Sequence, residues 1–155
     1  MLALAAMSFT GHAYAAFYDN SSQYMIASDT MEGKFYLDRS SIRQEEPTES
    51  NPCAISFAIL SVPRNGGMLE RTWYTVYYDK ANKIASYQVI GADALDADGN
   101  VSGITSTRGA GAMKRAIPLR SNMYYLADAC YLYFNHEHFY SRLADTKQPP
   151  GECWQ

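Results

Sequence analysis

Three groups of side chains in this sequence have residue types that bind metals or anions. The first is acidic: Asp93, Asp96, Asp98 and Asn100 lie within eight residues of one another. A calcium loop needs oxygen ligands at alternating positions, and the Asp-Ala-Asp run matches that spacing in part. Gly99 comes too early for such a loop, and no Glu closes it. A turn between two strands is therefore favoured over a metal site.

The second group is His136-Glu137-His138, near the end of the most helical segment. A pair of zinc ligands on a helix needs a spacing of three or four residues, because side chains two apart point to nearly opposite sides. Histidines near a helix C-terminus are stabilised by the helix dipole. We therefore expect a structural role for these histidines, and no metal site or cofactor is predicted.

The third group is a basic, glycine-rich stretch without an acidic residue between Asn100 and Ala127. Its candidate binding residues are Arg108, Lys114 and Arg115. Backbone amides of such a stretch can cradle an anion, but the spacing is not that of a phosphate loop. A solvated loop is favoured, and a small anionic ligand is kept as the alternative.

No set of nucleophile, base and oxyanion donors typical of an enzyme is found. Ser40 and Ser41 lie in a predicted turn and lack the Gly-x-Ser-x-Gly frame of a nucleophile elbow. We therefore predict no catalytic residue and a non-enzymatic function.

The most informative segment is the run Trp73-Tyr74-Thr75-Val76-Tyr77-Tyr78. As a strand it places Trp73 and Tyr77 on one face and Tyr74 and Tyr78 on the other. A sheet with one solvated face normally alternates apolar with polar residues, whereas both faces here are aromatic. A single helix can cover only one of them, so the other face is the expected contact surface. The alternative is that the Tyr hydroxyls simply reach water.

Alternating apolar residues predict an antiparallel meander of about five to six strands. The expected strands are residues 22–28, 34–38, 53–62, 70–78, 84–90 and 101–106. Turns or loops are expected at residues 39–42, 44–51 and 102–112. From residue 122 to about 143 the apolar period becomes helical, and Ser121 is a good N-cap. The predicted fold is α+β, with one long C-terminal helix packed on one sheet face.

Composition fits one globular domain. The chain has 155 residues, of which 47% are hydrophobic and 19% charged, with thirteen Tyr. A net charge of −3 gives no general attraction to nucleic acid or to anionic membranes.

Residues 1–15 read as a signal peptide. A short apolar run is followed by Ala13-Tyr14-Ala15, whose small first and third residues suit cleavage before Ala16. No Lys or Arg precedes the run, so a start further upstream, or a buried strand or helix, stays open. We expect an exported protein, periplasmic or at the cell surface and not inserted in the membrane after cleavage. Residues 16–155 would form one domain with a loose tail from about residue 144.

An exported chain with Cys53, Cys130 and Cys153 suggests one disulfide and one spare thiol. We favour Cys130–Cys153, because Cys130 lies on the apolar stripe of the helix and the tail is long enough to fold back. Cys53, at the start of a core strand, is the rival partner.

The run from Gly33 to Asp38 (GKFYLD), followed by Ser41-Ile42, resembles the opening of the bacterial surface-adhesin protein E-like family. The stretch from Ile117-Pro118 to Cys130 is similar to the family's C-terminal part, a Pro before a Cys-bearing helix. The chain departs from the pattern at the strand ending at Asp79, which lacks the Cys expected to partner the helix.

The resemblance implies a sheet-plus-helix fold, an envelope or surface location, and binding of host proteins in some members. The predicted function is a non-catalytic, adhesin-like protein-binding module whose partner is a second copy or another protein. A small-ligand or enzymatic domain using the basic loop is the alternative.

Overall fold

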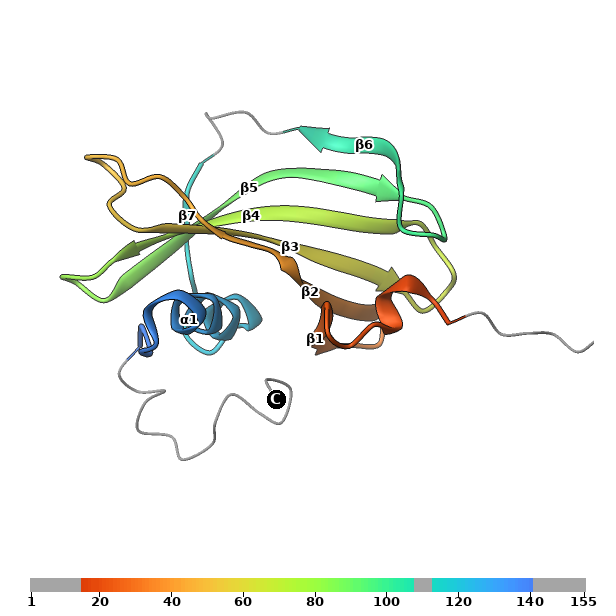
Figure 1. The fold of residues 1–155 in the computed structure, drawn as a ribbon, viewed down its shortest axis with the longest axis horizontal. Coiled ribbons are helices and arrows are strands. Elements are labelled where there is room, and N and C mark those ends of the chain that lie inside the picture. Colours follow the sequence, from red (N-terminus) through yellow and green to blue (C-terminus); the bar gives the residue numbers. More distant parts are fainter. Residues whose placement is uncertain (1–14, 108–112, 141–155) are drawn as a thin grey trace, which may run out of the picture.

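The computed structural model describes residues 15–107 and 113–140, which form an antiparallel sheet with an α-helix against one face (Figure 1). The elements are η1 (Phe17–Asp19), β1 (Tyr24–Asp29), β2 (Gly33–Gln44), β3 (Ala54–Pro63), β4 (Leu69–Asp79), β5 (Ile84–Leu95), β6 (Val101–Thr107), β7 (Arg115–Ala116) and α1 (Asn122–Asn135). Strands β1 to β6 follow in chain order across the sheet, and β7 pairs with β5. The predicted α+β meander is confirmed.

Strand β2 is longer than expected. The turn predicted at residues 39–42 is wrong, because β2 runs through them to Gln44. The pairing with β3 shifts register after Asp38. At this bulge Asp38 Oδ1 accepts hydrogen bonds from the Ser40 amide (3.0 Å) and hydroxyl (2.6 Å), and the Ser41 hydroxyl donates to the Asp38 carbonyl (2.6 Å). The serines that suggested a turn therefore form hydrogen bonds that stabilise a bulge inside a strand.

Strand β5 also outruns its predicted end at residue 90 and continues to Leu95. Its second half pairs with β6, so part of the loop predicted at residues 102–112 is strand. The β5–β6 connection is the turn that Asp96, Asp98 and Asn100 predicted. There Asp96 Oδ1 accepts the backbone amides of Asp98 (3.0 Å) and Asn100 (2.8 Å).

Helix α1 begins as predicted and ends early. The Ser121 hydroxyl accepts a hydrogen bond from the Tyr124 amide (3.2 Å), as an N-cap does. The predicted extension to residue 143 is wrong, because the helix ends at Asn135 and His136 takes a left-handed conformation (φ 54°). The His136 amide still bonds to the Leu132 carbonyl at 2.9 Å.

A buried carboxylate holds the chain after the helix. Asp128 is 3% exposed, and its Oδ1 accepts the Tyr140 backbone amide at 3.0 Å. Its Oδ2 lies 2.5 Å from His138 Nδ1. Phe139, fully buried, has its ring centroid 5.0 Å from that of Tyr78. Phe139 and Tyr140 thus belong to the core although they lie beyond the end of the helix.

The main core lies between α1 and one face of the sheet. Strand β3 and the residue before it supply the large side chains predicted for that face, Cys53, Ile55, Phe57 and Ile59. The helix contributes the apolar stripe expected from its period, and the buried members include Tyr124, Ala127, Cys130 and Tyr131.

The other face carries a smaller apolar cluster near the β3–β4 turn. Tyr36, Leu60 and Leu95 are buried there, with Phe17 and Tyr18 packed against them. The ring centroids of Tyr18 and Tyr36 are 5.5 Å apart. The N-terminal segment around η1 therefore covers this end of the face that α1 leaves open.

Candidate functional site

The aromatic residues of β4 divide between the two faces as their alternation predicts. Tyr78 is 2% exposed and donates its hydroxyl to the Ala127 carbonyl of α1 at 2.7 Å. Tyr74 stacks on Phe57 with ring centroids 5.8 Å apart. Tyr78 belongs to the main core, and the half-buried Tyr74 packs against it. Tyr74 and Tyr78 are thus structural, and the candidate binding surface is the face of Trp73 and Tyr77.

Trp73 is half-buried and held by a charged pair. Its Nε1 donates to Asp93 Oδ2 at 2.9 Å, and Arg71 Nη2 donates to the same oxygen at 3.0 Å. The Arg71 guanidinium also lies 5.1 Å from the centroid of the Trp73 ring. Burial alone would raise the pKa of Asp93, but the hydrogen bonds from Trp73 and Arg71 lower it. The carboxylate therefore stays charged and fixes the indole.

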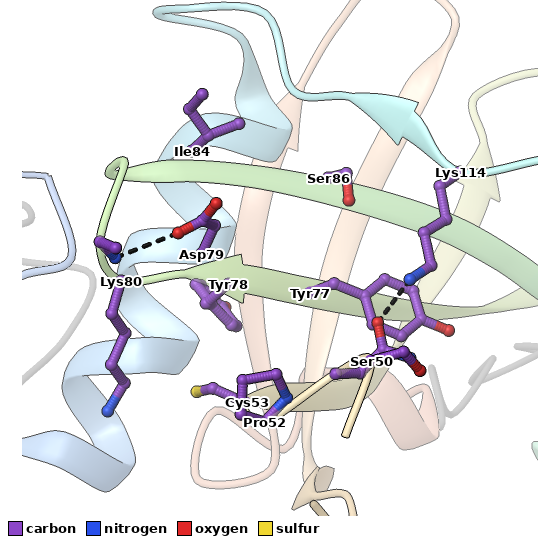
Figure 2. A pocket seen from close by; sticks show the side chains of 12 residues that line it. Ser50, Pro52, Cys53, Tyr77, Tyr78, Asp79, Lys80, Ile84, Ser86 and Lys114 are labelled. Carbon is purple, nitrogen blue, oxygen red and sulfur yellow. Dashed lines mark hydrogen bonds between the residues drawn. The ribbon is translucent and has the colours of Figure 1, made fainter. Parts of the chain in front are cut away.

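Tyr77 is covered by a lysine from a distant segment (Figure 2). Its hydroxyl donates to Gln88 Oε1 at 2.8 Å, so this hydroxyl is satisfied within the chain. The Lys114 ammonium lies 3.7 Å from the Tyr77 ring centroid and donates to Asn51 Oδ1 at 2.5 Å. Lys114 therefore ties the β2–β3 loop across the open face of β4.

A groove lies on this face beside Trp73 and Tyr77, with a volume of about 410 Å³. Among the residues that line it are Arg43, Glu45, Asn51, Trp73, Tyr77 and Ile90, and we call it the sheet groove. Ser56 and Thr75, which are buried and share a 2.7 Å hydroxyl hydrogen bond, also line it. A second hollow of about 770 Å³ is lined by Tyr77, Asn51 and Lys114 (Figure 2). It shares Tyr77 and Asn51 with the sheet groove.

The rim of the sheet groove is charged and open to solvent. Arg43 Nε pairs with Glu45 Oε1 at 3.1 Å, and their side chains are 67% and 36% exposed. Ile90 is 40% exposed and gives the rim an apolar side chain. The groove thus combines half-buried aromatic rings with exposed charges and an exposed apolar side chain.

The residues predicted to bind an anion have different surroundings. Lys114 is engaged by Tyr77 and Asn51. Arg115 is exposed in β7 and pairs with Tyr87, which packs against the main core on the helix side of the sheet. Arg108 lies outside the described residues. The basic cradle, kept as the alternative to a solvated loop, stays untested, because residues 108–112 lie outside the described residues.

The predicted Cys130–Cys153 disulfide is not formed. Cys130 is a free thiol with no exposed surface, packed between α1 and the sheet, where a tail could reach it only by entering the core. Cys53 is also free and buried, and Cys153 lies outside the described residues. Burial raises the pKa of both thiols, although the Lys80 charge opposes this at Cys53.

The sequence did not predict the Asp128–His138 contact, the Lys114–Asn51 tie or the packing of Phe17 and Tyr18. The first two join residues through turns whose geometry is not encoded locally.

Within residues 15–107 and 113–140, no three His, Cys, Asp or Glu side chains gather as metal ligands would. Over the same residues, no helix is long and apolar enough to span a membrane.

Comparison of the chain with family models, with curated proteins and with solved structures finds no match. The fold itself defines the class of protein: an antiparallel meander of six consecutive strands with one C-terminal helix among the described residues.

Proposed function

We propose that this chain is an exported, non-catalytic protein-binding module of the cell envelope or surface, and that the sheet groove is its contact surface. The observation that carries the proposal is the position of Trp73 and Tyr77 on the face that α1 does not cover. Trp and Tyr are enriched at protein interfaces, and they dominate binding when flanked by groups that exclude water.

The groove suits a protein segment better than a wide flat interface. Its floor is rigid, because Trp73 is held by Asp93 and Tyr77 by Gln88 and Lys114. Rigid aromatic side chains lose little conformational freedom on binding, which favours affinity from a small area. The exposed Arg43–Glu45 pair and Ile90 would contact the residues that flank the inserted segment.

The partner is a second copy of the chain or another surface or matrix protein. Sedimentation velocity at increasing concentration tests the first, and binding to immobilised extracellular-matrix and envelope proteins tests the second. The same variants serve both assays. Ile90→Glu and Arg43→Glu change exposed groove residues without disturbing the core.

Tyr133→Glu is the matched control, because Tyr133 is 61% exposed on α1 and away from the groove. We expect both groove variants to weaken association at least about tenfold, since losing 1.4 kcal/mol of binding energy has that effect. The control should bind like the wild type. A groove variant with unchanged affinity, or a control that binds as weakly, would refute the assignment of the surface.

The small-anion alternative has less support. Lys114 already has an aromatic ring and an amide oxygen as partners, so an anion would have to displace them. Calorimetric titration of inorganic phosphate tests this alternative. Millimolar or tighter binding that is lost in Lys114→Gln would favour it over the sheet groove.

A further inference from the structure

The backbone nitrogen of Ala16 has a carboxylate partner. The Ala16 amide donates to Asp19 Oδ2 at 2.9 Å, while the Asp19 amide donates back to the Ala16 carbonyl at 2.9 Å. These reciprocal bonds close the single turn η1. An amide is a modest donor to a carboxylate, and an ammonium group at the same position would form a stronger, charge-assisted bond.

The surroundings of Ala16 are acidic. A hollow of about 680 Å³ beside Ala15 and Ala16 is also bordered by Asp96 and Asp98, and no Lys or Arg of the described residues lines it. Hydrogen bonds from the Asn100 backbone amide and other amides of the turn lower the pKa of Asp96, so this carboxylate is ionised at neutral pH. A positive charge on the nitrogen of Ala16 would therefore meet negative charges both in η1 and across the hollow.

The chain joins the fold directly after this point. Phe17 and Tyr18 pack on the second apolar cluster, with the Phe17 ring centroid 5.2 Å from that of Tyr18 and 5.5 Å from that of Tyr24. Ala15 is exposed. The Ala15–Ala16 peptide bond thus directly precedes the packed segment, and it is also the bond that the Ala-x-Ala pattern marks for cleavage.

We propose that a signal peptidase hydrolyses the Ala15–Ala16 bond and that the new α-ammonium group of Ala16 forms an ion pair with Asp19, fixing Phe17 and Tyr18 over the open end of the sheet. Water is the co-reactant. The carboxylate remains on Ala15, and the amino group of Ala16 takes up a proton. The inference rests on the export part of the proposed function, and the groove is not required for it.

The ion pair has a defined pH dependence. The Ala16 nitrogen contacts Asp19 in η1, and Ala16 shares the hollow with Tyr18 and with Asp96 and Asp98 of the β5–β6 turn. Three carboxylates favour the ammonium form and raise its pKa above about 7.7–8.0, the value for an α-amino group in the unfolded chain. The ion pair therefore stabilises the fold fully at a pH below the pKa of the unfolded chain. This stabilisation is lost as the pH rises through the pKa of the α-amino group in the folded protein.

The test uses two forms of the chain, one beginning with a free amine at Ala16 and one extended by Gly-Ser before it. The extension keeps an amide on Ala16 and moves the charge away. At pH 6.5 we expect the Ala16 form to melt about 1–3 °C higher, the shift that an exposed ion pair produces in a domain of this size. The difference should vanish by about pH 10.

Asp19→Asn provides the control, because its amide oxygen can still accept the bond from Ala16 but carries no charge. In that background the two forms should melt together at every pH. Equal melting of the two wild-type forms, or a difference that persists in Asp19→Asn, would overturn the ion pair. Mass spectrometry of the exported protein should show Ala16 as first residue. A different first residue refutes the processing site, and an uncleaved, unexported chain refutes the export part of the proposed function instead.

Discussion

Replacing Asp128 with alanine removes the carboxylate that joins α1 to the segment after it. Asp128 is 3% exposed and accepts the Tyr140 amide at 3.0 Å, with His138 Nδ1 at 2.5 Å from its other oxygen. A hydrogen bond to a charged group contributes about 1.5–3 kcal/mol. The Tyr140 amide has no route to water once its acceptor is lost, whereas the side chain of His138, 23% exposed, can be rehydrated. We therefore expect Asp128→Ala to lower the free energy of unfolding by about 3 kcal/mol, which counts the bond to Tyr140 in full and the bond to His138 in part.

Urea unfolding followed by circular dichroism at constant pH measures this loss. Asp128→Asn should cost about half as much, because its oxygen can still accept the Tyr140 amide. Glu49→Ala, which truncates an exposed carboxylate, is the control and should leave the unfolding midpoint unchanged. A loss below about 1 kcal/mol in Asp128→Ala, or equal losses in both Asp128 variants, would refute the reasoning.

Three further predictions concern the fold and the groove floor. Cys53 and Cys130 should resist alkylation at pH 8 until the protein is unfolded, because burial keeps both thiols protonated; mass spectrometry that finds rapid labelling would contradict this. The hydrogen bonds that lower the pKa of Asp93 stabilise the fold at a pH above the pKa of an Asp in the unfolded chain, about 3.9. This contribution is lost as the pH falls through the pKa of Asp93 in the folded protein. Urea midpoints should therefore fall less steeply between about pH 4 and 2 in Asp93→Asn than in the wild type. Ser121→Ala should lower the free energy of unfolding by about 1 kcal/mol, because the Tyr124 amide loses its cap.

Local pattern predicted the elements that carry a strong alternation. The large face of β3 and the two faces of β4 follow from period two alone, since a one-residue slip would bury the wrong set. The start of α1 follows from Ser121, because a cap acts within one turn.

The errors lie where tertiary contacts override that pattern. Apolar residues continue at helical spacing past Asn135, but the bonds of Asp128 hold Tyr140 and His138 in a non-helical segment that fills the same core. The serines after Asp38 have turn chemistry, yet the pairing of β2 with β3 keeps them in a strand. Neither outcome can be read from a window of neighbouring residues.

The location of the sheet groove follows from what covers the rest of its face. At one end Phe17 and Tyr18 lie over Tyr36 and its neighbours. At the other end Lys114 ties the β2–β3 loop across Tyr77. The described residues hold no second α-helix to cover this face, so segments from outside the sheet close its ends. The groove beside Trp73 is what they leave open, and a partner would have to fit this hollow of about 410 Å³ rather than a broad aromatic surface.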